Sequence, residues 1–193
     1  MSDRTDKDAA APPETRVGLR DGTPVRIRVA RPEDRDKVVA AFNELEPDSV
    51  YKRFFSARKE LTATELDRLG ATDFVHFVGL LALVGSGARE TVIGAATYVA
   101  LPKRDSRRSA EVAFTIEEDF QGQGLAGRLF ASLIDVARRH GFDRFEADVL
   151  AGNAPMMKVF ERSGLPMSRT RDGGVTHVEM DLAPTGGQRQ EVA

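Results

Sequence analysis

Three glycines, Gly122, Gly124 and Gly127, lie between a β-like run at residues 110–116 and an amphipathic helical pattern that follows them. Glycine lets a backbone approach a phosphate closely, and the N–H groups at the start of a helix carry partial positive charge. A glycine cluster at such a strand-to-helix connection is typical of a site that binds the pyrophosphate of a nucleotide or a coenzyme.

The glycine cluster fits two binding motifs. Residues 122–127 (GQGLAG) match the dinucleotide pattern G-x-G-x-x-G, and residues 121–126 (QGQGLA) match the pattern Q/R-x-x-G-x-G/A of coenzyme A sites. A phosphate loop of the Walker type is excluded, because no Gly-Lys-Ser/Thr occurs. A third interpretation is a helix start that binds no ligand.

Three observations count against a dinucleotide. The first glycine of that motif belongs in a tight turn directly after the strand, yet five residues separate Ile116 from Gly122. Glu146 and Asp148, the acidic residues about 20 positions further on, lie inside a predicted strand and not at its carboxyl end. Only residues 128–193 follow the motif, too few for the rest of a doubly wound domain. These residues favour coenzyme A.

The chain from Ala110 to Leu165 resembles the GNAT superfamily, whose members transfer an acetyl group from acetyl-CoA to an amine. The resemblance rests on the pyrophosphate motif, on the strand EVAFTI before it, and on the segment NAPMMKVFERSGL that begins at Asn153. It implies that pantetheine lies in a gap between the strands at 111–116 and 145–150. The residues implied to contact acetyl-CoA are Ala113, Phe114, Thr115, Gln121, Gly122, Gln123, Gly124, Leu125, Ala126, Gly127, Arg128 and Asn153.

Asn153 has a second interpretation that is compatible with the first. It stands directly before a predicted helix that starts at Ala154 and carries Pro155 in its first turn. Asparagine is a preferred N-cap residue and proline suits the first turn. Asn153 can therefore cap this helix and contact pantetheine at once.

Glu111 is at the start of the strand along which the resemblance places the thioester of acetyl-CoA. The resemblance implies that this glutamate is the general base. A lysine-type ammonium has a pKa near 10.4, about 3 units above neutral pH, so a base helps substantially. The alternative is a solvated carboxylate at a strand end. Many family members carry a tyrosine that protonates the departing thiolate, but the matching residue here is Phe160, which cannot donate a proton. With no cysteine, the sequence favours direct transfer over an acetyl-enzyme.

The segment at 48–62 (DSVYKRFFSARKELT) indicates which kind of amine accepts the acetyl group. It resembles the Y-x-R-F-F segment of the bacterial Pat-type protein lysine acetyltransferases, which implies a protein lysine as the acceptor, with acyl-CoA synthetases as one type of target. Acetylation of a small-molecule amine and acyl-CoA binding without catalysis are the alternatives. Phe54 and Phe55 also suit a place in the hydrophobic core.

The composition, with 41% hydrophobic and 30% charged residues in 193, is ordinary for a globular protein of one domain. A net charge of −2 does not point to nucleic acid, and the absence of cysteine excludes disulfides and thiolate metal ligands. The three histidines lack metal-ligand spacing, so we expect no metal. No apolar run approaches the roughly 20 residues of a membrane span. We expect a cytoplasmic monomer or homodimer.

Hydrophobic periodicity predicts strands at 24–30, 74–84, 91–101, 110–116 and 144–150, and two more within 167–182. Helices are predicted at 31–45, 49–55, 62–70, from the glycine cluster to His140, and at 154–164. This order indicates an α+β or mixed α/β layered fold of the GNAT type, with a mostly antiparallel sheet and one β-α-β unit. We expect one domain at 16–182 between disordered tails at 1–15 and 183–193.

Overall fold

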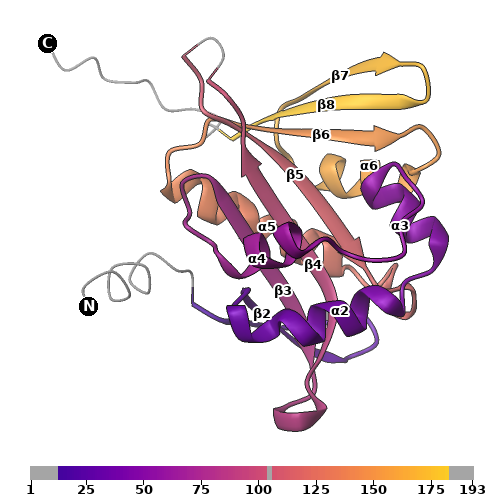
Figure 1. The fold of residues 1–193 in the computed structure, drawn as a ribbon. Helices are drawn as coiled ribbons and strands as arrows, with labels where there is room; N and C mark the ends of the chain where they lie inside the picture. The colour runs from indigo at the N-terminus through magenta and orange to yellow at the C-terminus, as the bar shows by residue number, and fades with distance from the viewer. Residues whose placement is uncertain (1–12, 104–105, 183–193) are drawn as a thin grey trace, which may run out of the picture.

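An eight-stranded sheet, in the order β1-β2-β3-β4-β5-β6-β8-β7, runs through the computed structural model, which describes residues 13–103 and 106–182 (Figure 1). The strands are β1 (Thr15–Gly18), β2 (Pro24–Val29), β3 (Phe77–Val84), β4 (Thr91–Ala100), β5 (Ser109–Ile116), β6 (Arg144–Leu150), β7 (Met167–Asp172) and β8 (Val175–Asp181). The helices are α2 (Arg35–Asn43), α3 (Pro47–Phe54), α4 (Ala63–Gly70), α5 (Leu125–Arg139) and α6 (Ala154–Arg162), with single 3₁₀ turns at η1 (Pro32–Asp34), η2 (Gly87–Arg89) and η3 (Glu118–Phe120).

The described sheet contains one parallel pair, β5 with β6, and every other neighbouring pair is antiparallel. A parallel pair needs a crossover connection, and α5 provides it between β5 and β6. This arrangement confirms the predicted mixed fold with one β-α-β unit.

Strands β5 and β6 pair over a short stretch and then separate. Their register joins Ser109 to Arg144, Ala110 to Phe145 and Glu111 to Glu146, and no later residue of β5 is paired with β6. Beyond that point β5 stays bonded to β4, while β6 stays bonded to β8. The N–H and C=O groups of β5 that face β6 beyond Glu111 therefore have no strand partner.

Helices cover both faces of the sheet. Helices α2, α3 and α4 lie on one face, and α5 and α6 lie on the other (Figure 1). The apolar stripe of α5, which includes Leu129, Phe130, Leu133 and Ala137, is fully buried against the sheet. No helix in the described ranges is both long and apolar enough to cross a bilayer.

Two expectations about the elements are wrong. The sequence predicts a strand from Phe74, but β3 begins at Phe77, because Asp73 Oδ1 accepts the N–H groups of Val75, His76 and Phe77 in a turn. His76 is therefore in a turn and not in a strand. The sequence also predicts no strand before residue 24, whereas β1 begins at Thr15, the last residue of the predicted tail, and pairs with β2. The rest of the two predicted tails, residues 1–12 and 183–193, lies outside the described residues.

Candidate active site

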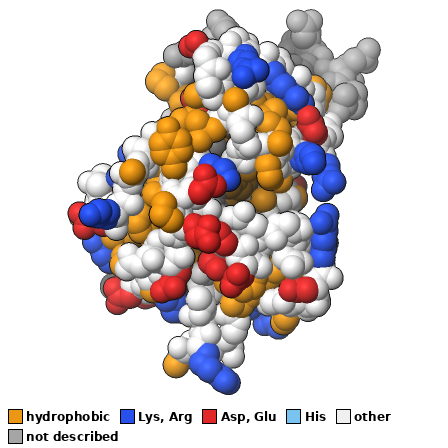
Figure 2. Space-filling model, turned by 90° about the vertical axis from the view of Figure 1, so that its right-hand side faces the viewer, with side chains coloured by type: hydrophobic (Ala, Val, Ile, Leu, Met, Phe, Trp, Pro, Cys, Tyr) orange, Lys and Arg blue, Asp and Glu red, His pale blue; other side chains and the backbone are white. Residues whose placement is uncertain are grey.

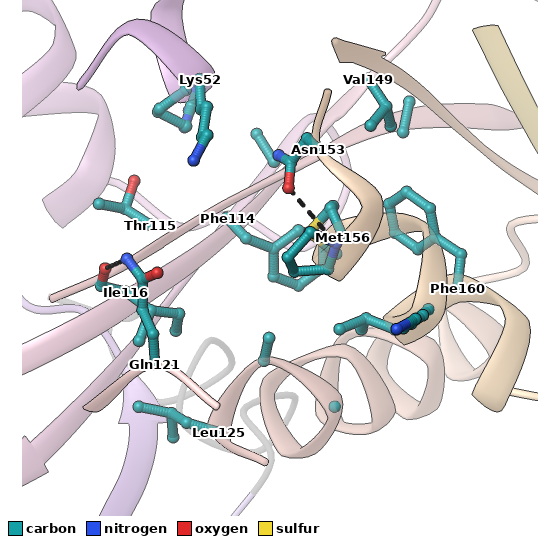
Figure 3. A pocket seen from close by; sticks show the side chains of 18 of the residues that line it. Lys52, Phe114, Thr115, Ile116, Gln121, Leu125, Val149, Asn153, Met156 and Phe160 are labelled. Atoms are coloured by element: carbon teal, nitrogen blue, oxygen red, sulfur yellow. Dashed lines mark hydrogen bonds between the residues drawn. The ribbon is translucent and has the colours of Figure 1, made fainter. Parts of the chain in front are cut away.

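A cavity of about 790 Å³ opens where β5 and β6 separate. Its walls come from the two strands, the glycine loop, the beginning of α5, one side of α6 along its length, and α3. Figure 3 shows Asn153, Met156 and Phe160 on one side of this space and Gln121 and Leu125 on the other. Its volume lies within the range of small-molecule and cofactor sites, roughly 300–1,000 Å³.

The glycine loop forms a cradle at the start of α5. Gly122 and Gly124 have φ angles of 71° and 90°, and Gly124 is the N-cap residue of the helix. Such positive φ angles are costly for residues with a Cβ, so the loop conformation requires glycine at both positions. No side chain caps this helix, and the N–H groups of its first turn lie open to an anion.

Two side chains brace this loop. The Gln121 Nε2 donates to the carbonyl of Ile116 at 3.0 Å and to the Ser49 hydroxyl at 3.2 Å. Arg20, in the turn between β1 and β2, donates from Nη1 to the carbonyl of Gly122 at 2.8 Å, and its backbone N–H donates to the carbonyl of Gln123. These contacts hold the loop to β5, to α3 and to the first hairpin.

Asn153 caps α6, as one of its two interpretations predicts. Its Oδ1 accepts the backbone N–H of Met156 at 3.3 Å, and Pro155 lies in the first turn. Asn153 also lines the cavity, so the cap leaves it beside the space between the strands. The two interpretations of this residue therefore remain compatible.

Glu111 lies at the end of the cavity where β5 and β6 begin to separate. Its side chain is exposed, and among the described residues its carboxylate has no hydrogen-bond or salt-bridge partner. The guanidinium of Arg53 on α3 also lines the cavity and is attracted electrostatically to Glu111. Burial is the main cause of a lowered pKa of Arg53, because the charged form loses hydration there.

Phe160 is a core residue, as expected. It is 1% exposed, and its ring packs against Phe114 and Phe130 at centroid distances of 6.1 and 5.3 Å. Its edge reaches the cavity, where it supplies an apolar wall. The residue that aligns with the family's usual proton donor therefore has a packing role here.

Most of the predicted site residues come together around the cavity. The lining includes Glu111, Ala113, Phe114, Thr115, Gln121, Gly122, Gly124, Leu125, Ala126, Gly127 and Asn153. Gln123 and Arg128 are absent from this lining: Gln123 contributes its carbonyl to the contact with Arg20, and Arg128 is exposed on α5. Leu125 is 1% exposed, so its side chain belongs to the core although the residue also borders the cavity.

The sequence did not identify several basic residues of the site. Arg20, Lys52, Arg53, Lys158 and Arg162 all line the cavity. Arg20 reaches the loop across 102 residues of sequence, and no local pattern could indicate this contact. Lys158 and Arg162 stand four residues apart, a helical spacing that places them on one face of α6.

Glu146, His177 and Glu179 also come together, although the sequence showed scattered histidines. One ligand atom from each lies within 4.8 Å of the others. The guanidinium of Arg144 contacts Glu146 at 3.2 Å and Glu179 at 3.1 Å, and the His177 Nδ1 is 2.8 Å from Asp148 Oδ1. Both carboxylates of this cluster thus share Arg144 as a salt-bridge partner.

Sequence comparisons place the chain among acetyltransferases. Residues 39–165 match the model of the acetyltransferase (GNAT) family. The acetyltransferase Pat of Mycolicibacterium smegmatis is 34% identical over 87% of this chain, and the chain spans about half (49%) of that relative. The acetyltransferase PA5475 of Pseudomonas aeruginosa is 36% identical, over 72% of this chain and 73% of that protein.

Solved structures show the same fold. The GNAT domain of S. lividans PAT superposes with a TM-score of 0.77 and 33% identity, covering 87% of this chain and 96% of that one. The Salmonella typhimurium acetyltransferase yncA, determined with its cofactor acetyl-CoA, superposes with a TM-score of 0.67 at 21% identity over 84% of this chain and 96% of that one. The chain therefore belongs to the GNAT acetyltransferase family, which agrees with the coenzyme A interpretation of the glycine motif.

Proposed function

We propose that this domain transfers the acetyl group of acetyl-CoA directly to the side-chain amine of a protein lysine. The observation that carries the proposal is the position of Glu111. Its unpaired carboxylate lies at the point where β5 and β6 separate, at the end of the cavity that runs to the glycine cradle. One cavity thus contains an anion-binding helix start and a carboxylate that can accept a proton.

The separated strands and the glycine cradle suit acetyl-CoA. The first N–H groups of α5 would hold the pyrophosphate, and the unpaired backbone groups of β5 near Ala113, Phe114 and Thr115 would hold the pantetheine arm. Asn153 would contact the same arm from the start of α6. Bound there, acetyl-CoA supplies a thioester as the acyl donor.

Glu111 would accept a proton from the acceptor ammonium and so release the nitrogen lone pair for attack. Backbone N–H groups of β5 that have no strand partner would stabilise the charge that develops on the carbonyl oxygen. No described side chain near Phe160 takes the place of the tyrosine that donates a proton in relatives. A thiol of pKa near 8.5 can leave as thiolate, which then takes a proton from solvent.

A protein acceptor is favoured by α3, which borders the cavity. Phe54 packs against Phe42 with a centroid distance of 6.0 Å, but Tyr51 and Phe55 are 48% and 39% exposed. Phe54 is half-buried and lines the cavity, and Phe55 is exposed, so neither ring has the core position that the sequence suggested. Exposed aromatic side chains beside a catalytic cavity are suited to contact another protein. Figure 2 shows apolar side chains on the surface around the hollow on this side of the molecule.

Incubation with labelled acetyl-CoA and host lysate tests the proposal. We expect label on lysine side chains of one or a few proteins, identified by mass spectrometry, and loss of this label with Glu111→Gln. Parallel assays use a panel of small primary amines. Rapid turnover of one small amine, with no protein labelled above the Glu111→Gln background, would contradict the protein acceptor. Binding of acetyl-CoA without turnover of any amine would contradict catalysis.

A further inference from the structure

Lys158 and Arg162 lie one helical turn apart on α6, and both line the cavity. Both side chains are exposed, and within residues 13–103 and 106–182 neither has a hydrogen-bond or salt-bridge partner. Glu161, the neighbouring acid, is engaged by Arg169 on β7 at 2.7 Å. Like charges four residues apart repel each other on a helix, so this pair is unfavourable until an anion binds.

The basic residues of the cavity differ in how they are engaged. Arg20 donates to the glycine loop, Lys52 pairs with Asp48, and Arg53 is attracted to Glu111. Lys158 and Arg162, on the helix that follows β6, are the lining cations of the described residues without such a partner, and the acidic side chains of the lining, Glu111 and Asp148, are on the strands. Figure 2 shows basic side chains gathered along one side of the hollow. An anionic part of a ligand is therefore attracted to the α6 side of the cavity.

Acetyl-CoA carries more phosphate than the glycine cradle can hold. The cradle offers backbone N–H groups to the pyrophosphate, but the adenosine end also carries a 3′-phosphate. A phosphomonoester has nearly two negative charges at pH 7 and three strong acceptor oxygens, and it pairs well with lysine and arginine. Lys158 and Arg162 lie about 6 and 12 Å along α6 from its first residue, past the end that Asn153 caps.

We propose that Lys158 and Arg162 bind the 3′-phosphate of the donor, and that they make this enzyme select free coenzyme A thioesters over thioesters that lack this phosphate. Thioesters that lack the 3′-phosphate are those of dephospho-coenzyme A and those of the phosphopantetheine arm of carrier proteins. Pantetheine and the pyrophosphate are common to coenzyme A and its dephospho form, so backbone contacts with those parts do not distinguish the two. The 3′-phosphate does.

Titration calorimetry with coenzyme A and 3′-dephospho-coenzyme A tests this proposal, because it does not depend on the acceptor or on turnover. We expect the wild type to bind coenzyme A about 10- to 100-fold more tightly than the dephospho form, since two charge-assisted contacts are lost. Lys158→Ala and Arg162→Ala should each reduce this ratio, and the double variant should bring it near one. Affinity for the dephospho form should stay close to that of the wild type.

Arg169→Ala is the matched control, because it removes an exposed arginine that is paired with Glu161 on the same helix. It should leave the ratio unchanged. In the wild type, raising the salt concentration should weaken the binding of coenzyme A more than the binding of the dephospho form. In the double variant, salt should affect the binding of the two ligands equally. Equal affinity of the wild type for the two ligands, or equal losses for both ligands in the double variant, would overturn the proposal. A change in the KM of the acceptor with an unchanged ratio would assign the two cations to the acceptor instead.

Discussion

Glu111 and Glu146 face each other as the last registered pair between β5 and β6. The two glutamates differ in their surroundings. Glu146 is 7% exposed and contacts Arg144, whereas Glu111 is exposed and has no such partner in the described part of the chain. The strands therefore separate at two carboxylates, of which one is neutralised by the fold and the other remains available to a substrate.

The first prediction concerns Glu111 as the base. Glu111→Gln keeps the shape of the side chain but cannot accept a proton near neutral pH, so turnover should fall by about 10²–10⁴-fold. The affinity for acetyl-CoA should change little, because backbone groups hold most of the donor. The loss should shrink as pH rises, since more of the acceptor amine is then already neutral. A pH–rate profile with one identified acceptor measures both effects.

Glu117→Gln is the control for this prediction. Glu117 is on the loop after β5, outside the cavity lining, and accepts the N–H of Asp119. Burial, followed by the charges of its acidic neighbours, raises the pKa of its carboxyl. Its variant should retain turnover near that of the wild type. If Glu111→Gln also keeps most of its turnover at pH 7, another group or positioning alone carries the reaction.

The second prediction concerns the cradle. Gly124→Val places a β-branched side chain at a φ of 90° and covers the N–H groups of α5, so acetyl-CoA binding should weaken severely. Gly141→Val is a matched control, because Gly141 has a φ of 72° at the other end of α5 and open space around it. Both variants should lose stability in thermal melts, and titration calorimetry should show weak binding only for Gly124→Val. Normal binding by that variant would place the pyrophosphate elsewhere.

The third prediction concerns Phe160. Phe160→Ala should lower the free energy of unfolding by about 3–5 kcal/mol, because it leaves a cavity among the rings of Phe114 and Phe130. Phe160→Tyr restores the family's hydroxyl and should leave turnover unchanged or mildly raised. Urea unfolding and steady-state kinetics test the two variants. A large loss of turnover in a stable Phe160→Tyr would reveal a further role for this wall of the cavity.

The fourth prediction concerns the capping box at the start of α4. Burial acts to raise the pKa of Glu65, but hydrogen bonds from Arg58 and Thr62 outweigh it and lower this pKa to about 2. Because the folded pKa is below the ordinary value of 4.5, the stabilisation is complete above pH 4.5 and is lost as pH falls toward 2. Glu65→Gln should therefore lower the melting temperature at pH 7 and have little effect at pH 2. Equal effects at both pH values would contradict this, and Glu60→Gln is the nearby control.

Local sequence determined the elements and the cradle. The stripe of α5 and the glycines at 122 and 124 depend on neighbours within a few residues, so periodicity and backbone preference identify them. The same holds for the predicted helix start at Thr62, where the structure has a capping box with Glu65. Asn153 is recognisable as an N-cap because it precedes a helical pattern with Pro155 in its first turn, which is also a local signal.

Tertiary structure decided which charges meet. Arg20 reaches the glycine loop, and His177 reaches Glu146 and Asp148, through strand pairings that join distant parts of the chain. The sequence also predicted a buried Phe55, but the end of α3 leaves that ring exposed beside the cavity. Long-range register and the separation of β5 from β6 arise from packing of the whole sheet, which no local pattern encodes. The glycine cradle and the Asn153 cap were therefore readable from the sequence, whereas the basic residues of the cavity and the cavity itself required the fold.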